Sequence, residues 1–124
     1  MAKQIILVFL GGGLGSALRF LITKYLNKAH FSIPYGTLSV NILGSLLLGI
    51  ILGWAIKNNA LNSNFNLALA IGFCGGFTTF SSFAFENQSL LKSGDYLHFI
   101  IYTLGSIILG ILAIGLGLLF SKSI

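Results

Sequence analysis

The sequence has very little charge. Of its 124 residues only 7% are Asp, Glu, Lys or Arg, including just two acidic residues, whereas 56% are hydrophobic. So few charged groups cannot coat a soluble globule, and the mean hydropathy of +0.96 instead predicts a membrane protein. The basic residues stand singly between apolar runs, without the clustering that a phosphate-binding surface needs. This scatter argues against a nucleic-acid-binding protein.

Cysteine and proline are almost absent, since each occurs once. The single cysteine, Cys74, cannot form an internal disulfide and is most simply a small buried apolar residue. Pro34 precedes a long apolar run and suits the start of a helix. The chain shows no cluster of nucleophile, base and metal-ligand side chains, so we do not expect an enzyme.

The chain falls into apolar runs that are each long enough to cross a membrane, which needs roughly 20 helical residues. A basic start before an apolar core also matches a signal peptide, but the core is long and Arg19 closes it, which favours a retained helix. A short chain without a signal peptide suits a prokaryotic inner membrane. We therefore expect an all-α membrane protein in which residues 1–124 form a single four-helix transmembrane domain, with helices at about residues 4–22, 33–56, 65–85 and 96–120.

The basic residues are divided almost evenly between the two sides of the membrane. An excess of Lys and Arg in cytoplasmic loops normally orients a membrane protein, and here almost no excess exists. A chain that inserts both ways can assemble as an antiparallel pair, and its small size also favours an oligomer; the alternative is that another feature fixes the orientation. Four crossings place Lys3, Lys57 and Lys122 on one side, and Arg19, Lys24, Lys28 and Lys92 on the other.

The stretch Gly72–Phe83 is unusual for the inside of a membrane helix. It contains the adjacent glycines Gly75 and Gly76, four hydroxyl side chains and four phenylalanines within twelve residues. Because lipid offers no hydrogen bonds, a glycine-weakened backbone must bury its freed carbonyls in protein or turn them toward an ion. The stretch therefore predicts a break near the centre of the third helix and an ion or partner beside it.

Polar residues recur at helical spacing inside the apolar runs. Burying an uncompensated polar group in hydrocarbon costs on the order of 2–7 kcal/mol, so these residues are the functional candidates. An asparagine in such a stripe can also simply join two helices. The stripes are Thr37, Asn41 and Ser45 in the second run, Tyr102, Ser106 and Gly110 in the fourth, and Thr78, Thr79, Ser81 and Ser82 in the third.

None of these candidate groups is ionised. A path for a cation would favour carboxylates, whereas amide N–H and hydroxyl O–H groups can donate hydrogen bonds to a small anion. Aromatic rings carry a positive edge, so Phe80 and Phe83, three residues apart on one helix side, are candidates to face that anion. For Phe73 and Phe77 we expect packing.

Three motifs resemble those of the CrcB/Fluc fluoride channels. They read Gly-Gly-Gly-Leu-Gly-Ser-Ala-Leu-Arg at residues 11–19, Gly-Thr-Leu-Ser-Val-Asn-Ile-Leu-Gly-Ser at 36–45, and Gly-Phe-Cys-Gly-Gly-Phe-Thr-Thr-Phe-Ser-Ser-Phe at 72–83. The resemblance spans all four runs, and the third motif is the most specific. It implies a dual-topology antiparallel homodimer with two fluoride pores and a structural sodium ion (Na⁺) at its centre.

The resemblance also implies roles for individual residues. The backbone carbonyls of Gly75 and Thr78 from both subunits would bind the sodium ion. Arg19 would either draw anions to a vestibule or pair with Glu86. A further hydroxyl position falls on Gly110, so water or a neighbouring Ser or Thr replaces it, or the polar track is shorter. The pore candidates are Asn41, Phe80, Phe83, Tyr102 and Ser106, to which the polar stripes add Thr37 and Thr79.

The expected function is passive, fluoride-selective export from the cytoplasm, which limits fluoride toxicity. A small proton-coupled multidrug transporter is one alternative, although such proteins need a membrane-embedded carboxylate and the first run has none. A non-transporting membrane assembly subunit is another, in which the polar residues would only join helices.

Overall fold

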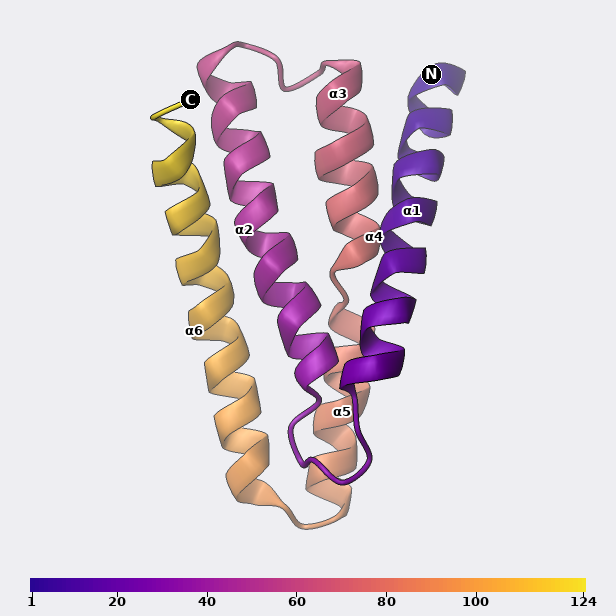
Figure 1. The fold of residues 1–124 in the computed structure, drawn as a ribbon, viewed down its shortest axis with the longest axis vertical. Coiled ribbons are helices and arrows are strands. Elements are labelled where there is room, and N and C mark those ends of the chain that lie inside the picture. Colours follow the sequence, from indigo (N-terminus) through magenta and orange to yellow (C-terminus); the bar gives the residue numbers. More distant parts are fainter.

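A computed structural model describes residues 1–124, and all of its regular secondary structure is helical, with no strand (Figure 1). Four segments are long and apolar enough to cross a membrane, as predicted. The third of these segments contains several helical elements in succession. The elements are α1 (Ala2–Leu26), α2 (Tyr35–Lys57), α3 (Asn64–Asn66), the π-helix η1 (Leu67–Cys74), α4 (Gly75–Phe77), α5 (Phe80–Lys92) and α6 (Tyr96–Ser121).

The observed helices run further than the apolar runs at several ends. The first helix continues to Leu26 rather than ending near residue 22, and α5 continues to Lys92 rather than ending near residue 85. Hydropathy marks the part of a helix that lies in hydrocarbon. The backbone hydrogen bonding continues beyond it into the polar residues at each end.

The chain begins and ends at the same end of the bundle (Figure 1). The turn that joins α2 to α3 lies at this end, whereas the α1–α2 loop and the α5–α6 turn lie at the other. Lys3, Lys57 and Lys122 thus lie near one end of the bundle and Lys24, Lys28 and Lys92 near the other, whereas Arg19 lies within α1 and bonds to Gly76.

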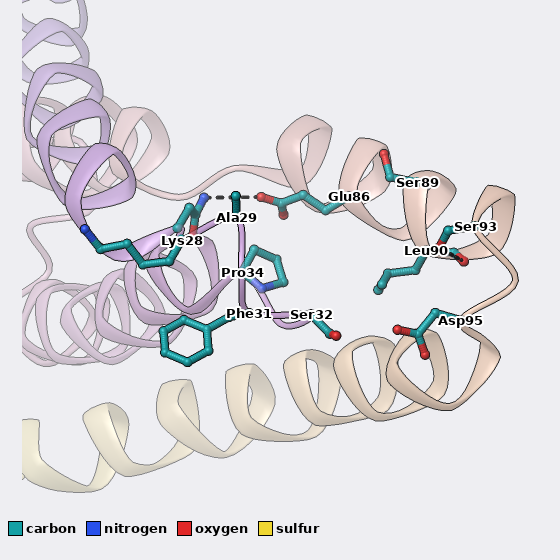
Figure 2. A pocket seen from close by; sticks show the side chains of 11 residues that line it. Lys28, Ala29, Phe31, Ser32, Pro34, Glu86, Ser89, Leu90, Ser93 and Asp95 are labelled. Atoms are coloured by element: carbon teal, nitrogen blue, oxygen red, sulfur yellow. Dashed lines mark hydrogen bonds between the residues drawn. The ribbon is translucent and has the colours of Figure 1, made fainter.

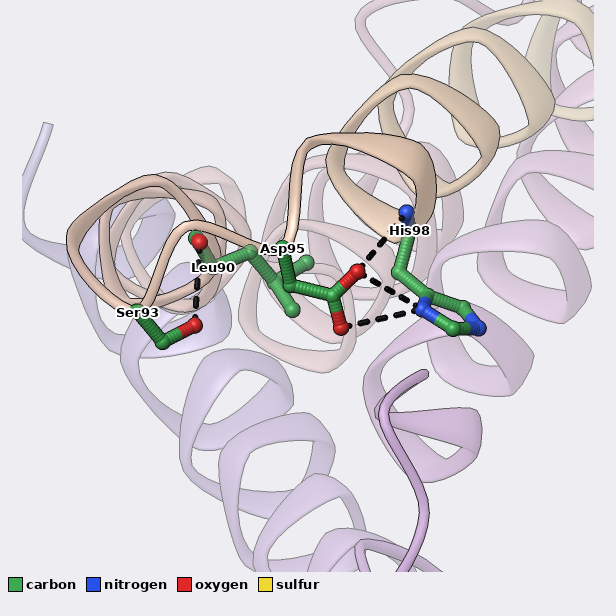
Figure 3. Close-up of polar contacts among 4 residues, drawn as sticks. All are labelled: Leu90, Ser93, Asp95 and His98. Atoms are coloured by element: carbon green, nitrogen blue, oxygen red, sulfur yellow. Dashed lines mark hydrogen bonds and ion pairs between the residues drawn. The ribbon is translucent and has the colours of Figure 1, made fainter.

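The start of α6 is capped by Asp95 (Figure 3). Its Oδ1 accepts a hydrogen bond from the backbone N–H of His98 at 3.3 Å, and both carboxylate oxygens lie 2.9 Å from Nδ1 of the His98 ring. These contacts with His98 hold the pKa of Asp95 below its ordinary value of 3.8. The stability that the charged cap contributes is therefore present above pH 3.8 and is lost as the pH falls through the lower folded-state pKa.

Backbones approach closely wherever α1 meets η1 and α4. A Cβ added at Gly11 would collide with the carbonyl oxygen of Ala68, and one at Gly15 would collide with that of Phe73. Close approach of this kind is the usual role of small residues at membrane helix interfaces. On the other side of the bundle Gly49 and Gly117 let α2 and α6 approach in the same way.

Replacing Gly11 by Ala is expected to destabilise the fold, because the methyl group meets backbone that cannot move without separating two helices. Overpacking of this kind costs about 1–3 kcal/mol. Gly13→Ala in the same helix is the matched control, since nothing lies within 4 Å of its added Cβ. Alanine is preferred over glycine inside a helix, so this variant should unfold at the same temperature as the wild type or higher. Thermal unfolding in detergent measures both, and equal midpoints for the two variants would contradict the packing described here.

The core of a single chain is small. Only 21 of 124 residues are buried, and the central cluster consists of Ile51, Ala70 and Cys74. The thiol of Cys74 is free and buried, as predicted. Apolar side chains along α1 and α6 are exposed instead, and lipid or a second protein chain must cover them.

Candidate functional site

A cavity of about 340 Å³ lies between α2, α5 and α6. It contains most of the residues that the sequence predicts to face an anion, and no charged side chain lines it. The lining residues are Asn41, Ser45, Leu48, Thr78, Thr79, Phe80, Phe83, Ser106, Ile107 and Gly110.

The third span loses its helical backbone beside this cavity. Thr78 (φ −84°, ψ 158°) and Thr79 (φ −150°, ψ 119°) are extended and join α4 to α5. The Thr79 hydroxyl accepts a hydrogen bond from the N–H of Ser82 at 3.1 Å and so caps α5. The span therefore bends at the two residues that follow the glycine pair and Phe77.

Asn41 holds this bend in place through both ends of its amide. Its Nδ2 donates to the carbonyl oxygen of Thr79 at 3.1 Å, and its Oδ1 accepts from the N–H of Thr79 at 2.7 Å. Only one Nδ2 hydrogen is used, so the second remains able to donate into the cavity. Asn41 thus joins two helices and lines the cavity at the same time.

Other carbonyls near the bend are also satisfied from within the chain. The Gly76 oxygen accepts from Nε of Arg19 at 2.9 Å and from the Ser16 hydroxyl at 3.4 Å. The Cys74 oxygen accepts from the N–H and hydroxyl of Thr78 at 3.0 and 2.9 Å. No side chain and no turn or cap N–H donates to the carbonyl oxygen of Gly75 or Thr78.

Within the single chain Arg19 forms no ion pair with Glu86, and its Nε donates to the Gly76 carbonyl instead. The bond from Arg19 to Gly76 stabilises the end of α4, where carbonyl groups carry partial negative charge. The one ion pair of the chain joins Asp95 and His98. The Arg19 side chain forms no hydrogen bond or ion pair with the residues that line the cavity.

The two predicted phenylalanines line the cavity next to each other. The ring centroids of Phe80 and Phe83 are 6.0 Å apart, and Phe80 is 79% exposed, so its ring projects from the single chain. Phe73 and Phe77 instead stack on each other at 5.5 Å, and Phe77 is 5% exposed, which agrees with a packing role.

The Ser106 hydroxyl on α6 is buried and has no hydrogen-bond partner in the chain. A buried hydroxyl without a partner costs free energy, so it indicates a group or ion that the single chain does not supply. Ser106 also lines the cavity, so its hydroxyl is placed to donate to a group bound there.

Thr37 and Tyr102 do not reach this cavity. Both are fully buried and donate to the carboxylate of Glu86, the Thr37 hydroxyl at 2.6 Å and the Tyr102 hydroxyl at 2.8 Å. The Phe83 ring packs 5.2 Å from the Tyr102 ring and so connects the cavity to this second polar cluster.

Asn27, from the loop after α1, completes the Glu86 cluster. Its amide donates to the Thr37 hydroxyl at 3.0 Å and accepts from the N–H groups of Gly36 and Thr37 at 2.7 and 3.1 Å. Glu86 also lines a second cavity of about 490 Å³ at this end of the bundle, where its side chain points toward the α1–α2 loop (Figure 2).

The sequence contained a signal for Glu86 but none for Asn27. Glu86 is the only carboxylate inside the spans, which marks it as a residue needing partners. Asn27 stands among ordinary turn residues, and its contacts depend on how the loop returns to α2.

Comparison with known proteins places this chain in a family. A model described as "CrcB-like protein, Camphor Resistance (CrcB)" matches residues 6–118. The chain belongs to the CrcB-like family. Proteins named "Fluoride-specific ion channel FluC" are similar over nearly their whole length. The one from Azobacteroides pseudotrichonymphae is 45% identical over 123 residues, covering 98% of both chains.

Two further FluC proteins show the same degree of similarity to this CrcB-like chain. That of Phocaeicola vulgatus is 46% identical over 121 residues, which cover 97% of this chain and 99% of the relative. That of Gloeothece citriformis is 47% identical over 121 residues, covering 96% and 97%. The similarity therefore extends through all four spans.

Proposed function

We propose that this CrcB-like chain is a fluoride-selective channel through which fluoride leaves the cytoplasm passively. The full-length similarity to proteins named fluoride-specific ion channels supports this function. The observation in the molecule that carries it is the cavity of α2, α5 and α6, where the buried Ser106 hydroxyl has no partner and no charged side chain is present.

The cavity suits a small anion better than a cation. Asn41 and Ser106 offer N–H and O–H donors, and the rings of Phe80 and Phe83 add positive edges. A proton-coupled drug transporter would instead need a carboxylate on the cavity wall. The one carboxylate within the spans, that of Glu86, accepts hydrogen bonds from Thr37 and Tyr102 instead.

We infer that the path continues from the cavity past Phe83 toward Tyr102 and Thr37, since the Phe83 and Tyr102 rings are in contact. Arg19, through its bond to Gly76, supports the bend from outside the path rather than forming a vestibule wall.

Passive transport suffices for export. Hydrogen fluoride is a weak acid that crosses membranes uncharged and dissociates at cytoplasmic pH, which traps fluoride inside. An inside-negative membrane potential then drives the anion out, by roughly 2.3 kcal/mol per charge for each 100 mV. A site for ATP or a proton relay is not required.

We propose that the functional unit is an antiparallel dual-topology homodimer in a prokaryotic inner membrane. The even division of basic residues supports insertion in both directions, and the small core leaves extensive apolar surface for a second copy. Phe80, which projects from the single chain, supports this further because a second copy would enclose the cavity.

A structural sodium ion fits the bend at this interface. No group of three or more His, Cys, Asp or Glu side chains is present, so a cation here would have to use backbone oxygens. Apart from regular helical hydrogen bonds, no donor of the chain reaches the carbonyl oxygens of Gly75 and Thr78. A Cβ added at Gly75 would have no atom within 4 Å, so there is open space beside it. These carbonyls from two copies would hold the ion, whose charge would stabilise the bent backbone.

Liposomes that contain the purified protein test the function. We expect rapid fluoride efflux when valinomycin carries potassium as counter-ion, and no chloride efflux in a parallel trace. Selectivity follows because only the smaller anion fits closely spaced donors. Release of neither ion from folded protein would contradict the channel, and proton-coupled drug efflux or partner subunits would then be examined.

A further inference from the structure

Ser45 on α2 faces Gly110 on α6 across the cavity. Both line it, and a Cβ added at Gly110 would have the Ser45 Oγ as its nearest neighbour, at 3.9 Å. Ser45 lies one helical turn beyond Asn41, and Gly110 lies one turn beyond Ser106. The two helices therefore present donors at two successive levels, and at the second level only α2 carries a hydroxyl.

The Ser45 hydroxyl is not bonded to its own helix. Mid-helix Ser and Thr commonly donate to the carbonyl four residues earlier, which satisfies the hydroxyl locally. Thr23 and Ser89 do so here, at 2.9 and 3.0 Å. The buried Ser106 hydroxyl has no partner in the chain. The partly buried Ser45 side chain forms no hydrogen bond within the chain either, so both hydroxyls at the cavity remain free to donate.

We propose that Ser45 supplies the anion-binding hydroxyl at the level of Gly110, opposite to the wall that carries Ser106. This inference rests on the proposed channel function. The absence of a side chain at Gly110 leaves the room that an ion needs beside the Ser45 Oγ. Ser45 then acts with Asn41 and Ser106 to pass a small anion from one level of the cavity to the next.

Moving the hydroxyl between the walls tests this role. Ser45→Ala should lower fluoride efflux about tenfold, because a hydrogen bond to a charged group is lost. The double variant Ser45→Ala/Gly110→Ser should restore most of the flux. Its new serine on α6 supplies a hydroxyl at the level of the cavity where the Ser45 hydroxyl was lost. A Cβ at Gly110 would be in ordinary contact with its one near neighbour, the Ser45 Oγ at 3.9 Å, so the backbone there accepts a residue larger than glycine.

Ser123→Ala is the matched control for the loss of a hydroxyl. Ser123 lies outside the spans and donates to the Phe120 carbonyl at 2.7 Å, so its removal should leave efflux unchanged. Thermal unfolding of each variant in detergent accompanies the flux assay. A reduced flux in Ser45→Ala at an unchanged unfolding temperature separates a role in conduction from one in folding.

The outcomes distinguish this inference from the proposed function. Fluoride efflux from the wild type with equal efflux from Ser45→Ala would overturn the role of Ser45 and leave the channel intact. A reduced flux that Gly110→Ser does not restore would overturn it as well, because the loss would then come from packing. No efflux from the wild type would reject the channel and this inference together.

Discussion

Fluoride efflux is expected to fall at least a hundredfold when Asn41 is replaced by Asp. The carboxylate cannot donate to the Thr79 carbonyl, which lies 3.1 Å from the amide nitrogen that it replaces, and it places a negative charge on the wall of an anion path. An uncompensated buried charge costs about 3 kcal/mol or more. Since every 1.4 kcal/mol is a factor of ten, the loss is about two orders of magnitude.

Asn58→Asp is the matched control for this change. Asn58 is exposed at the end of α2, and its Nδ2 also donates to a backbone carbonyl, that of Trp54, at 2.8 Å. The same chemical substitution there should leave efflux unaltered. Gel filtration and thermal unfolding show whether Asn41→Asp is folded, and wild-type efflux from this variant would remove Asn41 from the path.

The second large effect is expected from the combined replacement of Phe80 and Phe83 by Ile. Isoleucine keeps apolar bulk but lacks the positive ring edge, so the cavity loses aromatic groups that favour an anion. We expect fluoride efflux to fall at least tenfold in the double variant. The fold should persist, because Phe80 is largely exposed in the single chain.

Phe85→Ile provides the comparison on the same helix. Phe85 is 73% exposed and does not line the cavity, so the identical substitution should not change efflux. The dimer content of each variant is measured by gel filtration in detergent, because Phe80 also projects toward a neighbouring chain. Undiminished efflux from the double variant would show that the ring edges are not needed.

The fold could be predicted in large part because the bilayer restricts the choices. Runs of about 20 apolar residues in lipid must satisfy their own backbone, so four such runs predict four helices. The π-helix Leu67–Cys74 was not predicted, since nothing in its apolar sequence distinguishes it from an α-helix. In the structure α1 packs closely along it, with Gly11 against Ala68 and Gly15 against Phe73.

The site, like the fold, could be predicted only in part from the sequence. The polar stripe of Thr37, Asn41 and Ser45 was visible in the sequence as residues one turn apart. The structure separates it, since Thr37 binds Glu86 whereas Asn41 and Ser45 line the cavity. Helical spacing shows which residues share a face, but the neighbouring helix decides what each part of that face contacts.

By itself the sequence determined the membrane environment, the number of spans and the family, because these depend on local composition and on motifs of adjacent residues. Only the tertiary structure decided the hydrogen-bond partners of the polar side chains. Arg19 donates to Gly76, Asn41 donates to Thr79, and Thr37 and Tyr102 donate to Glu86. Each of these hydrogen bonds joins residues of different spans. Their directions depend on how the helices pack and rotate against one another, which no local pattern specifies.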